Sequence, residues 1–587
     1  MAISRLSNRM SKRVAALLAA CMISVGLVAC SPDSPSEPAA EPEEETAPPV
    51  EAVPAETVAF STDVEASEAL LTESSVAVVA STDENAQARA AVAALSLSAP
   101  MLTLNDNAEA VNAELDRLGV ETVFSVGDVQ LPAGLDVMVD PGVADALSTV
   151  IGSDVEVAES TTASDLIDMD PAAPSAPEMT VEEPQESAAE NGDQGAEGTE
   201  GSEGAESGDA GANEDEENAE DAQEGTEESP ENGNLVDLAP LEKGEVGPGN
   251  EDAAVFATSA SPLGLIANAR TAGLNPVMLP TADPRATADS MQLMRENEIA
   301  VGLGPAFGGT EAFATVAKMA ANAEELPGGG GLVFPGRRMV ALYGHPWGGA
   351  LGVLGEQGAA DAAALAQQYA DQYQEFSPEP VIPAFEIIAT VAAGGAGDDG
   401  NYSNVTPSED LTPYVDAITE AGGYVILDLQ PGRAHLLDQA KIYEDLLKRP
   451  NVGLALDPEW KLHGDDLPLE QVGHIDVSEA NEVAEWLAQL TRENNLPQKV
   501  FMLHQFQTQM IRNRDQLNTS HPELATVIHA DGHGTPGMKM DTWNAMLTDL
   551  PSGVWMAWKN FIDEDEPMLN PQQTMNIDPR PWIVSFQ

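Results

Sequence analysis

Acidic side chains that could perform acid–base chemistry are concentrated near residue 457. Asp457 and Glu459 follow the apolar run 452–456, and Asp428 lies near the end of another apolar run, 424–429. Hydrolysis of a glycosidic bond requires one protonated carboxyl group, which assists the leaving group, and one ionised carboxylate at the anomeric carbon. Crowding of like charges raises the pKa of one carboxyl and so supplies the acid form near neutral pH. We therefore predict Glu459 as the proton donor, with Asp457 and Asp428 as orienting or stabilising carboxylates.

Further polar side chains follow other apolar runs of the same region. We predict that the following residues bind the substrate: His345, Gln430, Trp460, His504, Gln505, Asp531, His533 and Lys559. One polar residue after a strand does not indicate a site, but polar residues after five or six strands predict a binding site at one rim of the fold. Glu386 stands at the start of its run instead, and we therefore expect it inside the fold, paired with a cation.

Eight short apolar runs between residues 336 and 587 are expected to be strands. They are Met339–Tyr343, Phe385–Val391, Tyr424–Leu429, Val452–Leu456, Val500–Leu503, Ala525–His529, Val554–Trp558 and Trp582–Phe586. Helical patterns separate most of them, at 358–374, 411–421, 434–447, 478–494 and 508–515. Near-continuous apolar strands with intervening helices indicate a parallel sheet covered on both faces, and eight such units predict a (β/α)8 TIM-like barrel with its active site at the C-terminal ends of the strands. The alternative is an open doubly wound sheet, although no GxGxxG fingerprint occurs.

A metal-dependent hydrolase is a competing hypothesis. His529-x-Asp531-x-His533 supplies two imidazoles and a carboxylate, and His345 or His504 could complete such a site. The leading hypothesis includes no metal ligand and no cofactor. A third hypothesis is a non-catalytic adaptor that binds wall glycan through an inactive barrel.

The charge of the chain excludes one class of partner. Its 587 residues include 98 Asp or Glu and 25 Lys or Arg, which gives a formal net charge of −73. Nucleic-acid binding needs a basic footprint, so no nucleic-acid partner is expected. Residues 178–232 contain 21 acidic and no basic residues. Low apolar content and self-repulsion predict a disordered tether at 31–57 and an acidic disordered linker at 159–250.

The first thirty residues have the features of a targeting signal. Basic residues precede an apolar stretch at 14–28, which is too short for a stable membrane span and ends in Leu27-Val28-Ala29-Cys30. The pattern resembles a bacterial lipoprotein signal peptide, which implies cleavage before Cys30 and lipidation of its thiol. The alternative is an ordinary secretory signal with an incidental cysteine. We expect an extracytoplasmic protein whose lipid anchor holds it to the cell membrane.

Two smaller segments, 58–158 and 251–327, have a related pattern of strands alternating with helices, which predicts parallel βαβ modules. The first contains Pro100-Met101-Leu102-Thr103-Leu104 and ends this pattern in Val123-Phe124-Ser125-Val126-Gly127. It resembles the cell-wall-binding repeat type 2 of Gram-positive surface proteins, which joins a helix to a P-x-L-L strand and ends in V-x-x-V-G-G. The second segment resembles it less closely, with Gly302-Leu303-Gly304 at the corresponding position. The resemblance implies attachment to anionic wall polymer, although both copies are acidic; a scaffolding module is the alternative.

The segment Asp457-Pro458-Glu459 resembles the strand-four D-x-E motif of chitinase-type glycoside hydrolases. In that family the Glu is the acid and the preceding Asp orients the substrate, which implies the same roles for Glu459 and Asp457. The longer D-x-x-D-x-D-x-E run is absent from this chain. Together these patterns predict a surface-anchored lipoprotein that hydrolyses or binds cell-envelope polysaccharide, with the membrane and a cell-wall or envelope glycan as its partners.

Overall fold

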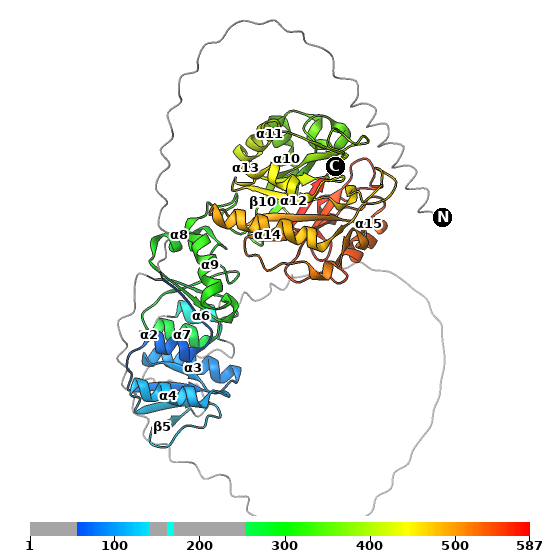
Figure 1. The fold of residues 1–587 in the computed structure, drawn as a ribbon. Helices are drawn as coiled ribbons and strands as arrows, with labels where there is room; N and C mark the ends of the chain where they lie inside the picture. Colours follow the sequence, from blue (N-terminus) through cyan, green and yellow to red (C-terminus); the bar gives the residue numbers. More distant parts are fainter. Residues whose placement is uncertain (1–55, 141, 143–160, 170–252) are drawn as a thin grey trace, which may run out of the picture.

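The computed structural model describes residues 56–140, 142, 161–169 and 253–587. The predicted signal peptide with Cys30, residues 31–55 of the predicted tether and most of the predicted linker lie outside the described residues. Figure 1 shows the described chain as a smaller N-terminal body, coloured blue to green, and a larger C-terminal body, coloured green to red. Every helix among the described residues falls short of the length and apolar character that a membrane crossing needs.

The N-terminal body contains two four-stranded parallel sheets. The first consists, in spatial order, of β3 (Met101–Thr103), β2 (Val76–Ala80), β4 (Thr122–Val126) and β5 (Asp136–Val139). The second consists of β1 (Glu56–Phe60), β8 (Ile299–Leu303), β6 (Ala253–Ala257) and β7 (Pro276–Met278). Strands alternate with helices in both segments, as the sequence pattern predicts.

Helices lie between these sheets and over their outer faces. In the shared core are α2 (Asp63–Leu70), α3 (Glu84–Leu97) and α7 (Leu263–Thr271), with α6 (Ala163–Asp168) packed against α7. The outer face of the first sheet is covered by α4 (Ala108–Leu118), and that of the second by α8 (Ala288–Glu296) and α9 (Gly309–Asn322). The inner strands β2, β4, β6 and β8 are therefore covered on both faces, which explains why they are apolar without alternation.

Buried Asn268 on α7 joins the two modules by hydrogen bonds. Its Oδ1 accepts from the main-chain N–H of Met101 at 2.7 Å, and its Nδ2 donates to the main-chain oxygens of Asp63 at 2.9 Å and Met101 at 3.0 Å. Because α3 consists largely of alanine, α3 and α7 can approach closely around this contact. The two modules thus share one core.

The strand β1 belongs to the second sheet although it precedes the first sheet in the chain. It pairs with β8 along its whole length. Val58 and Phe60 pack into the core shared by the sheets, while Ala59 packs into the outer core beneath α8 and α9. Glu56 and Thr57, which fall within the predicted tether, are the first residues of this strand.

The C-terminal body is a closed barrel of eight parallel strands, as predicted from the eight apolar runs. The strands are, in order around the barrel, β9 (Arg338–Gly344), β10 (Val381–Ala392), β12 (Tyr424–Leu429), β13 (Val452–Leu456), β15 (Lys499–Gln505), β17 (Leu524–Ala530), β18 (Trp555–Asn560) and β19 (Ile583–Phe586). The sheet closes because β9 pairs with both β10 and β19. A short strand, β11 (Ser403–Val405), extends β10 in the antiparallel sense.

Alternation along these strands separates two apolar cores. One core fills the barrel with residues such as Ala341, Ala384, Ile426, Met502 and Val527. The residues between them face outward, beneath the surrounding helices. These helices are α10 (Ala359–Gln374), α11 (Ser408–Glu420), α12 (Leu436–Ile442), α13 (Glu444–Leu447), α14 (Val477–Glu493), α15 (Pro536–Leu547) and α16 (Pro571–Met575).

The prediction of a helix at 508–515 is wrong. This connection from β15 to β17 contains two 3-10 turns and the short strand β16 (Ile511–Arg512), which pairs with β14 (Ile475–Asp476). Asn513 adopts a left-handed backbone conformation at φ 58°, which interrupts an α-helix. Met510 and Ile511 are buried, so the apolar residues that suggested a helical face instead fix an irregular loop.

The N-terminal end of the barrel is closed by the segment that enters it from the N-terminal body. Phe334 is 2% exposed, and its ring lies 5.4 Å from the ring of Trp555 and 5.3 Å from that of Trp582. Buried Arg337 donates hydrogen bonds to the main-chain oxygens of Pro327, Gly329 and Leu332, which folds the glycine-rich segment back on itself. Water is therefore excluded from this end, and the opposite end remains for a site.

Candidate functional site

One inward-facing polar side chain from each strand forms a layer at the C-terminal end of the barrel. These eight residues, here called the polar ring, are Tyr343, Glu386, Asp428, Asp457, His504, His529, Lys559 and Ser585. Each stands two positions beyond an apolar residue that fills the barrel, and Asp457, two positions beyond Ala455, lies immediately after the last residue of β13. All eight are buried. The polar ring therefore rests on an apolar floor, where electrostatic interactions are only weakly screened.

His504 forms the centre of the polar ring. Its Nδ1 lies 2.9 Å from Oδ2 of Asp531, and its Nε2 lies 2.6 Å from Oε1 of Glu386 and 4.0 Å from Oδ1 of Asp428. Burial lowers the pKa of His504, but the carboxylates of Glu386, Asp428 and Asp531 outweigh that effect and hold the pKa well above the ordinary value. In this structure His504 is consequently an imidazolium that links two strands' carboxylates.

His529 occupies the adjacent position on β17. Its Nδ1 lies 3.4 Å from Nε2 of His504 and 3.5 Å from Oε1 of Glu386, and its Nε2 lies 3.0 Å from the Ser585 hydroxyl. Burial lowers the pKa of His529. The two neighbouring imidazoles therefore differ in charge, with His529 neutral.

Tyr343 and Lys559 complete the opposite side of the polar ring. The Tyr343 hydroxyl donates to Oδ2 of Asp428 at 3.0 Å and accepts from Nε2 of Gln430 at 3.4 Å. The Lys559 ammonium lies 3.7 Å from the centre of the Tyr343 ring and 3.9 Å from Oδ2 of Asp531. The ammonium thus contributes a cation–π contact and positive charge beside a carboxylate.

Asp457 of the polar ring is the N-cap of a 3-10 turn, η4 (Pro458–Trp460), which contains Glu459. The Asp457 main-chain N–H donates to the Leu429 oxygen at 3.0 Å, which holds Asp457 beside β12, and Oδ1 of Asp457 accepts from the Glu459 N–H at 3.2 Å. Asp457 is 3% exposed, whereas Glu459 is half-buried. Among the described residues, no side chain pairs with the Glu459 carboxyl, so it is the acid that a ligand could reach.

The carboxyl groups of the site divide into two classes by pKa. Burial raises the pKa of Glu386, but His529 and His504 outweigh it and lower this pKa below its ordinary value. Burial also raises the pKa of Asp531, but His504 and Lys559 lower it below its ordinary value. Burial, with the nearby carboxylates of Asp428 and Asp531, raises the pKa of Asp457 to about 8. Burial and the carboxylates of Asp457 and Asp531 likewise raise the pKa of Glu459 to about 8.

Asp428 lies between these classes. Burial and Glu386 raise its pKa and His504 and Lys559 lower it, and the net effect is an increase to about 6. Protonated and ionised carboxyl groups therefore coexist at neutral pH within one site, which is the condition for paired acid and base chemistry.

The structure brings together most of the residues predicted from the sequence. Asp428, Asp457, His504 and Lys559 belong to the polar ring, and Asp531 is bonded to it. Glu459 and Trp460 lie on η4 above it, and Gln430 is linked to it through Tyr343. Glu386 lies inside the barrel beside the His504 cation, as expected.

Three predicted substrate-binding residues lie outside the polar ring and contact other parts of the barrel. Gln505 faces away from the interior because it neighbours inward-facing His504; it accepts from Arg514 and donates to the main-chain oxygens of loop residues 507 and 508. His345 Nε2 lies 3.1 Å from the Thr406 hydroxyl, and burial lowers the pKa of this imidazole. His533 lies in the loop after β17, with its ring 5.6 Å from that of Phe561.

Tyr343, His529 and Ser585 were not predicted as parts of the leading site. Each lies within an apolar run rather than after it, so the rule that functional residues follow strands passes over them. The available signal was alternation: a polar residue two positions from an inward-facing apolar one, repeated in several runs.

No protein-family model matches this chain, and no curated protein matches it. The functional argument therefore rests on the geometry of the site.

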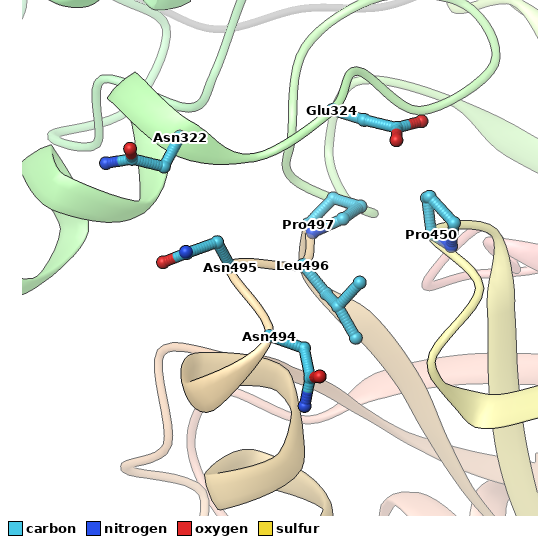
Figure 2. A pocket seen from close by; sticks show the side chains of 7 residues that line it. All are labelled: Asn322, Glu324, Pro450, Asn494, Asn495, Leu496 and Pro497. Carbon is cyan, nitrogen blue, oxygen red and sulfur yellow. The ribbon is translucent and has the colours of Figure 1, made fainter. Parts of the chain in front are cut away.

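A separate pocket of about 330 Å³ lies at the junction of the N-terminal body and the barrel (Figure 2). It is lined by Asn322, Glu324, Pro450, Asn494, Asn495, Leu496 and Pro497. Glu324 is the one ionisable residue in this lining, so the pocket lacks a pair of acid and base groups. The polar ring, rather than this pocket, is therefore the candidate functional site.

Proposed function

We propose that this protein is an extracytoplasmic lipoprotein whose barrel is a (β/α)8 barrel of the TIM type that hydrolyses a polysaccharide of the cell envelope. The observation that carries the proposal is the convergence of carboxyl groups from neighbouring strands, with half-buried, unpartnered Glu459 at the accessible edge. Helices after most of the strands support the barrel type, although the connection from β15 to β17 has 3-10 turns in place of an α-helix among its residues.

In this proposal Glu459 donates a proton to the oxygen of the glycosidic bond as the bond from this oxygen to the anomeric carbon breaks. Water then adds to the anomeric carbon and gives up a proton to the Glu459 carboxylate, which restores the acid form. The Glu459 pKa of about 8 supports this role, because the carboxyl is largely protonated at neutral pH. Asp531 remains ionised beside His504 and Lys559, and its carboxylate would stabilise the positive charge that develops at the anomeric carbon. Asp457 and Asp428 orient the sugar through hydrogen bonds. His504 and Lys559 hold Asp531 in its ionised form.

Two tryptophans support a carbohydrate substrate. Trp347 is 61% exposed in the loop after β9, and Trp460 is half-buried on η4 beside Glu459. Aromatic rings with one apolar face exposed suit stacking against sugar rings. Trp460, next to Glu459 on η4, would stack against a sugar ring close to the proton donor.

The location of the substrate follows from the predicted anchor. Lipidation at Cys30 would hold the protein on the outer side of the cell membrane, and the predicted tether that precedes β1 would allow the barrel to reach wall glycan. The two parallel-sheet modules would serve as wall-binding or spacing elements.

The test compares the wild-type protein with Glu459→Gln on purified Gram-positive cell walls. We expect the wild type to release reducing ends. The rate of release should fall at least about 100-fold in the variant, because a general acid contributes about 10²–10⁴-fold to the rate. Glu470→Gln is the matched control, since Glu470 is exposed on the following loop and should leave the rate unchanged.

Other results would separate the alternatives. Equal turnover by the wild type and Glu459→Gln would refute the assignment of the proton donor. No reducing ends from the wild type, together with equal cosedimentation of both proteins with walls, would support the non-catalytic adaptor.

A further inference from the structure

Three buried side chains of the polar ring direct one donor atom each toward a common point. They are Oε1 of Glu386, Nε2 of His504 and Nδ1 of His529, which all lie within 4.8 Å of one another. The two distances to His529 Nδ1 are 3.5 Å from Glu386 and 3.4 Å from His504, while Glu386 and His504 are 2.6 Å apart. The three residues come from β10, β15 and β17, so the closed barrel alone brings them together.

The second nitrogen of each imidazole is already occupied. Asp531 binds Nδ1 of His504, and the Ser585 hydroxyl lies 3.0 Å from Nε2 of His529. These contacts fix both ring orientations and direct the remaining nitrogens toward Glu386. A carboxylate or hydroxyl on the far nitrogen is the arrangement that holds and orients histidine ligands of metal ions.

Carboxylate oxygens around this point have unused bonding capacity. Oε2 of Glu386 and Oδ1 of Asp428 are fully buried and have no hydrogen-bond partner among the described residues. An unsatisfied buried carboxylate oxygen is costly, which makes such oxygens rare without a cation nearby. The Lys559 ammonium contacts Asp531 and the rings of Tyr343 and Phe561.

We propose that Glu386, His504 and His529 bind a divalent first-row transition-metal ion, with Zn²⁺ as the best fit and Asp428 as the neighbouring carboxylate. Two imidazoles and a carboxylate form a donor set typical of zinc sites with an open fourth position. Mg²⁺ and Ca²⁺ fit less well because they select oxygen ligands. This site differs from the His529-x-Asp531-x-His533 set considered from sequence, since only His529 is common to both.

The geometry requires one small adjustment. Ligand atoms about 2.1 Å from a tetrahedral zinc ion lie about 3.4 Å apart, which matches the two distances to His529. The 2.6 Å contact between His504 and Glu386 must lengthen, and the proton that they share must leave to solvent. Binding should therefore release a proton and weaken as the pH falls.

The test measures metal content rather than turnover. The purified full-length protein is treated with a chelator, dialysed against micromolar Zn²⁺ and analysed by inductively coupled plasma mass spectrometry. We expect about one zinc ion per chain, a loss of at least about 100-fold in affinity for His529→Ala, and a loss of about 10–100-fold for Ser585→Ala, which removes only the outer contact. Co²⁺ in place of Zn²⁺ should give the visible absorption of a tetrahedral site.

The control is the double variant His463→Ala/His474→Ala. These two rings stack 4.2 Å apart outside the barrel interior and are the other paired histidines that could capture zinc. The double variant should retain full binding. Zinc at background level in the wild type, or stoichiometric zinc in His529→Ala but not in the double variant, would overturn the proposal.

If His529→Ala loses the native circular dichroism spectrum, the zinc affinities of Ser585→Ala and Glu386→Gln test the proposal by the same titration. Unchanged zinc affinity in both would overturn the proposal. The zinc proposal does not depend on the glycan proposal, because zinc is measured without substrate and reducing ends are measured on walls. Failure of either one therefore leaves the other standing.

Discussion

Replacing Asp457 by asparagine should stabilise the folded barrel increasingly as the pH rises. Asp457 is 3% exposed, and burial with the nearby carboxylates raises its pKa from 3.8 to about 8. Between these two values the folded state holds a proton that the unfolded state has released, so stability falls as the pH rises. Asparagine is neutral at every pH and can still accept the 3.2 Å hydrogen bond from the Glu459 N–H.

The size of the effect follows from proton linkage. Each pKa unit corresponds to about 1.4 kcal/mol, so the penalty carried by Asp457 approaches about 4 kcal/mol at pH 7. The charge of Asp457 also raises the pKa of Glu459, so its removal lowers that pKa and offsets part of the gain. We therefore expect Asp457→Asn to gain about 2–4 kcal/mol at pH 7, with an increase of roughly 1 kcal/mol per pH unit between pH 5 and 8.

Tryptophan fluorescence provides a selective assay. All seven tryptophans lie between residues 347 and 582, so urea unfolding followed by their emission reports on the barrel. Measurements at pH 5, 7 and 8.5 avoid the sequence pI of about 4.1, where solubility is lowest. Asp465→Asn, on an exposed loop, is the matched control and should show no pH-dependent difference.

A constant difference from pH 5 to 8.5, or a loss of stability in Asp457→Asn at pH 8.5, would refute the reasoning. Either result would mean that the carboxylate of Asp457 is ionised in the folded protein.

Three further predictions concern the base of the barrel, the N-terminal body and the site. Phe334→Ala should cost about 3–5 kcal/mol of barrel stability in urea, since it removes the ring between two tryptophans; exposed Ile562→Ala is the control, and an equal effect of both would contradict the packing of Phe334 at the N-terminal end of the barrel. Asn268→Ala leaves buried main-chain groups without partners and should destabilise the N-terminal body by about 2–4 kcal/mol, seen as faster amide hydrogen exchange at Met101, with the tryptophan transition unchanged; unaltered exchange would show that Asn268 does not join the modules. Turnover on cell walls should fall as the pH rises through about 8, where Glu459 loses its proton, and a rate that still rises above pH 8 would contradict the proton donor.

The eight barrel strands could be predicted from the sequence because a parallel strand buried on both faces is a short, nearly continuous apolar run. The same runs indicated where strands end, and so which residues face the C-terminal end of the barrel. Asp428, Asp457, His504 and Lys559 were found in this way. The expectation of no nucleic-acid partner rests on the acidic composition alone and stays a prediction.

The irregular parts depended on distant contacts. The strand β1 pairs with β8, more than 200 residues further along the chain, and no local pattern specifies that partner. The segment 508–515 has helical spacing, but burial of Met510 and Ile511 against the loop that contains β14 favours turns and a short strand.

Closure of the barrel decided which polar residues act together. Periodicity along one strand shows which residues share a face, but it does not show which face is inside or which residues lie at the same height. Those depend on the register between strands that are far apart in sequence. Tyr343, Glu386, His529 and Ser585 became parts of one polar ring only when β9 paired with both β10 and β19. The sequence alone determined that polar groups would reach the end of a barrel, and the tertiary structure decided which of them share a proton, a cation or a hydrogen bond, because those interactions act only over a few ångströms.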